Sequence, residues 1–222
     1  MCGRFVRRKT MPEIAEEFGV EEIVADLKPS YNIAPTQEVA MVISDGGRKL
    51  LQARWGLIPA WADDPSIGNR MINARAETVT QKASFKNPFR KQRCLIVADG
   101  FYEWMQAGRG KKPFFIHLKS GRSFGFAGLY ENWLSPERER ITTCTIITTD
   151  ANELMKPIHQ RMPVIIPKEK EDLWLDPAQK DESALLDLLK PYPSNLMEAY
   201  EVSRVVNTPA NNSPACLEPV AP

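Results

Sequence analysis

The sequence predicts an α+β fold in which mostly antiparallel strands curl into a barrel-like core, with short helices at the periphery. Three observations support this prediction. Short apolar runs separated by turn signals recur along the chain, as on the two sides of Asp45-Gly46-Gly47. Helix signals are few and brief. The 18 prolines, about 8% of the chain against a usual ~5%, indicate many loops and ordered turns.

Length, composition and net charge limit the kinds of protein to which this chain can belong. A length of 222 residues suits one large domain, and 43% hydrophobic and 26% charged residues are typical of a soluble globular protein. No apolar run approaches the ~20 residues that span a bilayer, and no secretory signal is visible, so we expect a cytoplasmic protein without a membrane partner. The net charge of +1 argues against a protein that coats nucleic acid by bulk charge, while allowing a local basic face.

The cysteines do not indicate a metal site. They are widely scattered, and none of their spacings is that of metal ligands. We therefore expect no metal or organic cofactor. The four are Cys2, Cys94, Cys144 and Cys216.

The first half of the chain predicts a strand, a helix and a hairpin, in that order. Residues 2–8 form the strand. Thr10 as N-cap, an early proline and Glu13 at the capping-box position begin a helix that Gly19 can end. Later segments are an extended piece at 31–35, paired strands at 37–44 and 49–55, and a loop that leads through 71–78 into a short helix.

The second half predicts mainly strands. The apolar run 94–98 reads as a buried strand. Further strands follow at 101–105, 113–119, 123–133, 141–149, 164–166 and 198–206, with a basic turn at 106–112. A second capping-box pattern, 150–153, predicts a short helix, and two more helices are expected around 168–175 and 182–189. We expect one domain over 1–207 and a Pro- and Asn-rich tail over 208–222 that is ordered only in part.

Cys2 is the first candidate for chemistry. If Met1 is removed, as is usual before a small side chain, Cys2 carries an α-amine and a thiol on adjacent carbons. Their ordinary pKa values, about 7.7–8.0 and about 8.5, leave both partly nucleophilic near neutral pH. Such a pair can trap an aldehyde as an imine and then as a thiazolidine, or act as an N-terminal nucleophile on amides. A buried strand cysteine is the alternative.

Two titratable side chains are further candidates. His159 follows a proline-broken segment and precedes Arg161, which suits a proton-transfer group presented at a rim. The other histidine, His117, sits in an apolar strand as an ordinary strand residue. Glu103 lies on the same strand face as Phe101, so it is either at an exposed edge or buried within a site, where burial would raise its pKa.

Several polar and aromatic residues are compatible with nucleic-acid binding. Asn73 could orient a reactive group and Arg75 could hold a phosphate, or they could be a turn residue and a surface residue. Arg4 lies in a basic cluster near Cys2, which together with Trp61 could form a groove for single strands. Scattered basic surface residues are the alternative.

Six motifs occur in one order along the chain, and together they resemble the SRAP family, the SOS response-associated peptidases now regarded as abasic-site processing proteins. The resemblance covers residues from 2 to about 207. The motifs are Met1-Cys2-Gly3-Arg4-Phe5, Tyr31-Asn32-Ile33-Ala34-Pro35, Trp55-Gly56-Leu57-Ile58-Pro59, Ile72-Asn73-Ala74-Arg75-Ala76-Glu77-Thr78, Asp99-Gly100-Phe101-Tyr102-Glu103-Trp104 and His159-Gln160-Arg161-Met162-Pro163.

The resemblance implies a covalent sensor of DNA damage. It implies binding to single-stranded DNA that contains an abasic site, and a thiazolidine crosslink between the ring-opened sugar and the N-terminal cysteine, with crosslinking or lyase-like activity. By motif, the nucleophile is Cys2 and the catalytic partners are Asn73, Glu103 and His159. The implied DNA contacts are Arg4, Arg75 and Arg161 at phosphates, with Pro35 and Trp61 lining the groove.

One departure from the family pattern affects the groove. Relatives often carry two adjacent tryptophans where this chain has Trp61-Ala62, so a base-stacking wedge would be weaker or come from another side chain. We expect a monomer that associates with the nucleoid when it binds DNA.

Two other functions remain open at this stage. An N-terminal-nucleophile thiol peptidase, acting on itself or on other chains, would use the same terminus. A non-covalent reader of modified or single-stranded DNA would use the same groove without forming a bond.

Overall fold

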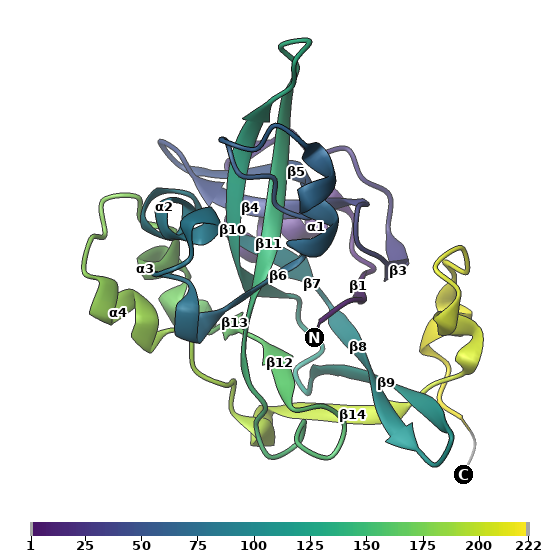
Figure 1. Ribbon diagram of the computed structural model, residues 1–222. Coiled ribbons are helices and arrows are strands. Elements are labelled where there is room, and N and C mark those ends of the chain that lie inside the picture. Colours follow the sequence, from purple (N-terminus) through teal and green to yellow (C-terminus); the bar gives the residue numbers. More distant parts are fainter. Residues whose placement is uncertain (1, 221–222) are drawn as a thin grey trace.

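Five strands form a closed barrel in the computed structural model, which describes residues 2–220. They are β4 (Glu38–Ser44), β5 (Arg48–Trp55), β7 (Arg93–Ala98), β10 (Phe124–Leu134) and β11 (Arg140–Asp150). The order β11-β10-β7-β4-β5 is antiparallel throughout, and β5 returns to pair in parallel with β11, which closes the ring. This confirms the predicted α+β class with a barrel-like core (Figure 1).

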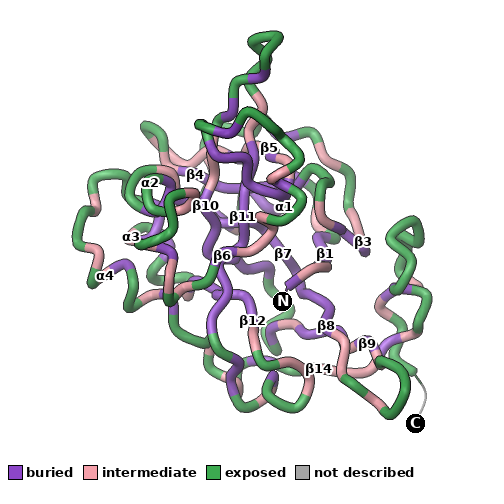
Figure 2. Tube along the Cα trace, viewed as in Figure 1, coloured by how far each residue is buried: buried purple, intermediate pink, exposed green. Residues whose placement is uncertain are grey.

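A second antiparallel sheet packs beside the barrel. Its order is β14 (Met197–Glu201), β9 (Gly110–Leu118), β8 (Gly100–Ala107), β1 (Phe5–Arg7) and β3 (Ser30–Ile33). Phe5 joins the two parts, because its ring meets those of Trp55 and Phe126 edge-on, with centroids 5.1 and 5.7 Å away. Figure 2 shows that the buried residues follow these central strands of both sheets.

Four short strands are attached to the barrel. β6 (Asn73–Arg75) pairs in parallel with β11, and β12 (Arg161–Pro163) pairs antiparallel with the same strand. β13 (Ile165–Ile166) pairs with β10, and β2 (Glu22–Ile23) pairs with β5. β6 and β12 therefore meet at one end of β11.

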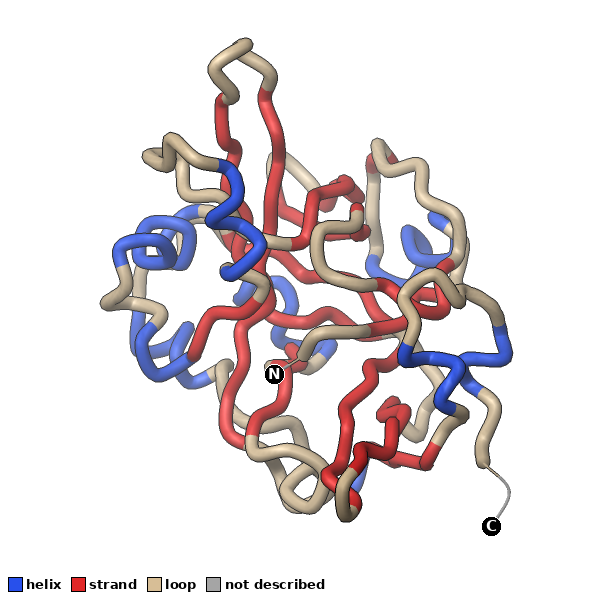
Figure 3. The backbone as a smooth tube through the Cα atoms, turned by 45° about the vertical axis from the view of Figure 1, so that its right-hand side comes forward, coloured by secondary structure: helices blue, strands red, loops and turns tan. Residues whose placement is uncertain are grey.

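The helices lie at the periphery, as predicted (Figure 3). In α1 the Glu13 carboxylate accepts hydrogen bonds from the Thr10 backbone N–H at 2.8 Å and from its hydroxyl at 2.7 Å. Gly19, with φ of 61°, ends the helix as expected. The α-helices are α1 (Met11–Phe18), α2 (Ala83–Lys91), α3 (Glu171–Leu175) and α4 (Glu182–Asp187). The short 3₁₀ segments are η1 (Pro65–Arg70), η2 (Ala76–Thr78), η3 (Lys168–Lys170), η4 (Ser194–Leu196), η5 (Arg204–Asn207) and η6 (Pro214–Leu217).

Some predicted elements are wrong in detail. The helix expected after Asp150 is a series of turns, because Asp150 still pairs with Arg161 in the β11–β12 ladder. Asn152 caps the first turn by accepting from the Met155 N–H at 3.0 Å. The strand expected at 198–206 ends at Glu201 and gives way to η5. The expected basic turn at 106–112 shrinks to residues 108–109, since β8 and β9 extend into it.

The C-terminal segment is more ordered than expected. The Asn212 side chain accepts from the Tyr31 N–H at 2.6 Å, and Cys216 is fully buried. Residues 208–220 therefore pack on the second sheet, while the domain boundary at 207 stays a prediction. Within residues 2–220, none of the helices combines the length and the apolar character that a membrane crossing demands.

Candidate active site

Cys2 lies three residues before β1, so the strand expected from residue 2 begins only at Phe5, and Glu103 lies on the neighbouring strand β8. β1 and β8 pair antiparallel with Phe5 opposite Phe101, and the Tyr102 N–H donates to the Arg4 carbonyl at 2.9 Å. Continuing this register places the start of the chain beside Glu103. Both side chains are enclosed, with Cys2 0% and Glu103 4% exposed. Of the two interpretations made from sequence, Glu103 is therefore buried and not at an exposed edge.

Burial changes the titration of both groups. It raises the pKa of the Glu103 carboxyl to about 7, so this group exchanges protons near neutral pH. Burial also raises the pKa of the Cys2 thiol, and the nearby Glu103 charge raises it further. The thiol therefore stays protonated at neutral pH.

Asn73 is presented by β6, where it pairs with Ile146 of β11. Its Nδ2 donates to the Ile72 carbonyl at 2.9 Å, which fixes the amide plane. Its Oδ1 is buried and accepts no hydrogen bond from the residues that the structure describes. Because a buried acceptor without a donor is unfavourable, this oxygen suits a donor supplied by substrate.

His159 lies at the end of the turns between β11 and β12. Its backbone N–H donates to the Met155 carbonyl at 2.8 Å. Its Nδ1 accepts from the Arg161 N–H at 2.9 Å, so the neutral ring carries its proton on Nε2. Burial lowers the pKa of His159, and the charges of Lys111 and Arg161 lower it as well.

One apolar cluster between the barrel and the second sheet connects these groups. Cys2 belongs to it, together with Phe101 two residues before Glu103, Ile72 beside Asn73, and Ile158 beside His159. Lys111 lies close enough to lower the pKa of both Glu103 and His159. These charge interactions place Cys2, Glu103 and His159 in one neighbourhood, and Asn73 is connected to it through Ile72 of the same apolar cluster.

Arg4 is held from several sides. Its Nη1 donates to Asn32 Oδ1 at 2.7 Å and to the Val206 carbonyl at 2.8 Å, and its guanidinium stacks over Trp104 with 5.6 Å to the ring centroid. Burial lowers the pKa of Arg4. These contacts tie β1 to the C-terminal segment, so Arg4 has a structural role whether or not it contacts DNA.

The other predicted DNA contacts differ in their availability. Arg161 is engaged by two carboxylates, those of Glu77 and Asp150. Arg75 is exposed, Pro35 is partly exposed, and Trp61 is 61% exposed. Arg75 and Trp61 are therefore accessible to a ligand as the protein stands, whereas Arg161 is not. All these DNA contacts stay predictions.

Comparison with known proteins decides the family. The family model described as "SOS response associated peptidase (SRAP)" matches residues 1–209. The chain belongs to the SRAP family. A Bacillus subtilis relative of this family, named abasic site processing protein YoqW, is 50% identical over 98% of this chain and 99% of its own. The chicken protein named abasic site processing protein HMCES is 34% identical, over 87% of this chain and 67% of its own.

Solved structures share the fold of this chain. A crystal structure of a protein from Bacteroides thetaiotaomicron matches with a TM-score of 0.92 at 29% identity, covering 99% of this chain and all of that one. Its printed title gives no activity, so this similarity supports the architecture.

Some site residues of this SRAP chain were not singled out from sequence. Asn32 donates to the carbonyls of Val206, Thr208 and Asn211 and accepts from Arg4. Glu77 pairs with Arg161, and Lys111 faces Glu103 and His159. Asn32 and Glu77 lie inside the matched motifs, so their place in these motifs could have marked them as candidates. Nothing in the local sequence marks Lys111.

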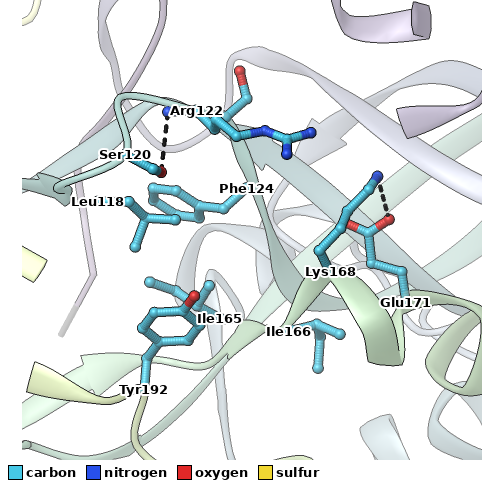
Figure 4. Close-up of a pocket in the computed structure, with 10 residues that line it drawn as sticks. Leu118, Ser120, Arg122, Phe124, Ile165, Ile166, Lys168, Glu171 and Tyr192 are labelled. Carbon is cyan, nitrogen blue, oxygen red and sulfur yellow. Dashed lines mark hydrogen bonds and ion pairs between the residues drawn. The ribbon is translucent and has the colours of Figure 1, made fainter. Parts of the chain in front are cut away.

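No group of three metal-binding side chains occurs among the described residues. A separate cavity of about 150 Å³ lies between the second sheet and α3. Figure 4 shows its apolar wall of Leu118, Phe124, Ile165 and Tyr192, with the Lys168–Glu171 ion pair at 2.9 Å on its rim. Its ten lining residues include none of the four candidate catalytic residues.

Proposed function

We propose that this SRAP protein recognises abasic sites in single-stranded DNA and captures the sugar aldehyde covalently through the α-amine and thiol of Cys2, thereby shielding the lesion. The observation that carries the proposal is the burial of Cys2 close enough to Glu103 to feel its charge, with a Glu103 carboxyl whose pKa is about 7. The names of the relatives, abasic site processing proteins, supply the substrate.

The first step is ring opening. The abasic sugar is mainly a closed hemiacetal, and opening it moves a proton from the anomeric hydroxyl to the ring oxygen. His159 suits this transfer because its neutral ring presents Nε2–H as donor while Nδ1 is held by Arg161. Asn73 Oδ1 can accept from a sugar hydroxyl or from the α-amine and hold the reacting atoms in place.

The second step forms the imine and the third closes the ring. The α-amine adds to the aldehyde carbon, and the resulting carbinolamine loses one water to give the imine. Glu103 takes a proton from the amine and returns it to the departing hydroxyl. The thiol sulfur then adds to the imine carbon while its proton passes to the nitrogen, which gives the thiazolidine without an outside oxidant or reductant.

These three reaction steps require that Met1 is removed, because only then does Cys2 carry a free α-amine. This removal stays a prediction, since Met1 lies outside the residues that the structure describes. The raised pKa of the Cys2 thiol favours amine-first chemistry over the peptidase alternative, since a thiol peptidase attacks through a thiolate.

DNA would lie along the accessible groups. Arg75 can contact a phosphate, and the exposed ring of Trp61 can stack on a base. A single strand is favoured because the sugar must reach buried side chains, which an intact duplex would obstruct.

The test compares three substrates under denaturing electrophoresis: an abasic single-stranded oligonucleotide, the same oligonucleotide without the lesion, and a plain peptide. We expect a heat-stable protein–DNA band with the abasic oligonucleotide alone. Cleavage of the peptide without any DNA adduct would support the peptidase, and reversible retention of DNA without an adduct would support the non-covalent reader.

A further inference from the structure

Glu77 holds Arg161 by a paired contact. Arg161 Nη1 lies 2.6 Å from Glu77 Oε1, and Nη2 lies 2.9 Å from Oε2, which is a two-point guanidinium–carboxylate pair. Nη1 also donates to Asp150 at 2.8 Å, and Nη2 to the Thr148 carbonyl at 2.8 Å. The Glu77 side chain is 47% exposed, whereas that of Asp150 is 81% exposed, so the Glu77 contact is the better shielded of the two ion pairs.

The topology explains why these residues meet. β6 and β12 both pair with the end of β11, with Thr148 opposite Arg75 on one side and Pro163 on the other. Glu77 follows β6 directly in η2, and Arg161 begins β12. The ion pair therefore ties the strand that carries Asn73 to the strand that follows His159.

The backbone of Arg161 is in turn the partner of the His159 ring. Its N–H donates to Nδ1 at 2.9 Å, and its carbonyl lies 3.1 Å from the same nitrogen. Because a backbone N–H can only donate, the neutral ring must carry its proton on Nε2. When the ring gains a second proton, Nδ1 can donate to the carbonyl instead. A small rotation of residue 161 would disturb both contacts.

We propose that Glu77 is a positioning residue of this site: by clamping the Arg161 side chain, it fixes the backbone that sets the tautomer and orientation of His159. The proposal rests on the proposed function, in which His159 opens the sugar ring.

The charges around His159 agree with this assignment. Burial lowers its pKa most, the charges of Lys111 and Arg161 lower it further, and Glu103 faces the same neighbourhood from β8. Glu77 and Asp150 offset the charge of Arg161, and the hydrogen bonds from Arg161 lower the pKa of Glu77. Without Glu77, the positive charge next to His159 would be less compensated, and the ring would protonate at lower pH.

The same ion pair bears on DNA binding. A phosphate that contacted the Arg161 guanidinium would have to displace Glu77 or share the arginine with it. If Glu77 positions His159, neutralising Glu77 should change the tautomer of His159. If Glu77 instead competes with phosphate for Arg161, neutralising it should tighten DNA binding.

The first measurement needs no DNA. In ¹⁵N-detected NMR of DNA-free protein, we expect His159 to show the Nε2–H tautomer, with His117 as an internal reference on β9. Glu77→Gln should mix the tautomers and lower the pKa of His159. Glu153→Gln is the matched control, because Glu153 pairs with Lys156 on the same turns and is 79% exposed. Glu77→Asp, which keeps the charge on a shorter side chain, should show a smaller change in the same direction.

The second measurement compares crosslinking rates. With Glu77→Gln the rate on a natural abasic oligonucleotide should fall roughly 10- to 100-fold. An oligonucleotide bearing an aldehyde that cannot cyclise should react at nearly the wild-type rate. Unchanged NMR of His159 together with tighter DNA binding would overturn the proposal and make Glu77 a competitor of phosphate. Failure of the wild type to crosslink at all would refute the proposed function, while the NMR result would still decide the role of Glu77.

Discussion

Replacing Glu103 by glutamine should stabilise the protein while slowing its chemistry. Burial raises the pKa of Glu103 from an ordinary 4.5 to about 7. Between these values the folded protein keeps a proton that the unfolded chain has released, so the free energy of unfolding falls as the pH rises from 4.5 to 7. At 1.36 kcal/mol for each pKa unit, the loss is about 3 kcal/mol, complete above pH 7 and absent below pH 4.5.

Glutamine has nearly the same shape and no charge to bury. Glu103→Gln should therefore match the wild type at pH 4 and exceed it by about 3 kcal/mol at pH 8. For a chain of this length that corresponds to a rise in Tm of roughly 6–12 °C. Urea denaturation at several pH values measures the difference, with Glu16→Gln on the exposed face of α1 as control.

The same variant should crosslink abasic DNA more slowly, because it cannot exchange a proton with the α-amine. A gain in stability coupled to a loss of activity is typical of a residue retained for function. If the stability curves of variant and wild type run parallel from pH 4 to pH 8, the burial of an ionisable Glu103 is wrong.

Three further predictions concern structure, DNA binding and ring opening. Asn32→Ala removes the donor to three carbonyls and the acceptor for Arg4, so it should lower the free energy of unfolding by about 2–3 kcal/mol in urea denaturation; an unchanged midpoint would contradict this role. Arg75→Ala should weaken single-strand binding and reduce the slope of log affinity against log salt by about 0.7, and an unchanged slope would exclude a phosphate contact. His159→Ala should slow adduct formation about 100-fold on the closed-ring sugar and much less on a non-cyclising aldehyde; equal slowing would show that His159 does not act in ring opening.

Much of the barrel was predictable because its signals are local. The hairpin of β4 and β5 follows from the apolar runs on the two sides of Asp45-Gly46-Gly47, and the apolar run of β7 marks a buried strand. Closure of the ring was not predictable, because β5 and β11 pair through residues as distant as Arg54 and Thr143. A short helix was expected after 71–78, but the bounds of α2 could not be predicted, since its lysines and Pro88 hide a short apolar face.

The candidate site shows the same division. Cys2, Asn73, Glu103 and His159 could be named because each lies in an ordered motif. The ion pair between Arg161 and Glu77 could not be predicted, since it depends on two short strands, β6 and β12, that meet at the end of β11. The helix predicted from the capping-box pattern at Asp150 was wrong for the same reason. Asp150 pairs with Arg161 in the β11–β12 ladder, and this pairing cannot be seen in the residues next to Asp150.

Mass spectrometry of the protein after reaction with an abasic oligonucleotide tests the central claim most directly. A thiazolidine at Cys2 predicts a denaturation-resistant adduct whose mass is the sum of the reactants, with Met1 removed, less one water. Fragmentation should place it on Cys2, its thiol should resist alkylation, and borohydride should add no hydrogen to it. An adduct on a lysine, a thiol that still alkylates, or a mass gain of two hydrogens on reduction would contradict capture by the paired amine and thiol.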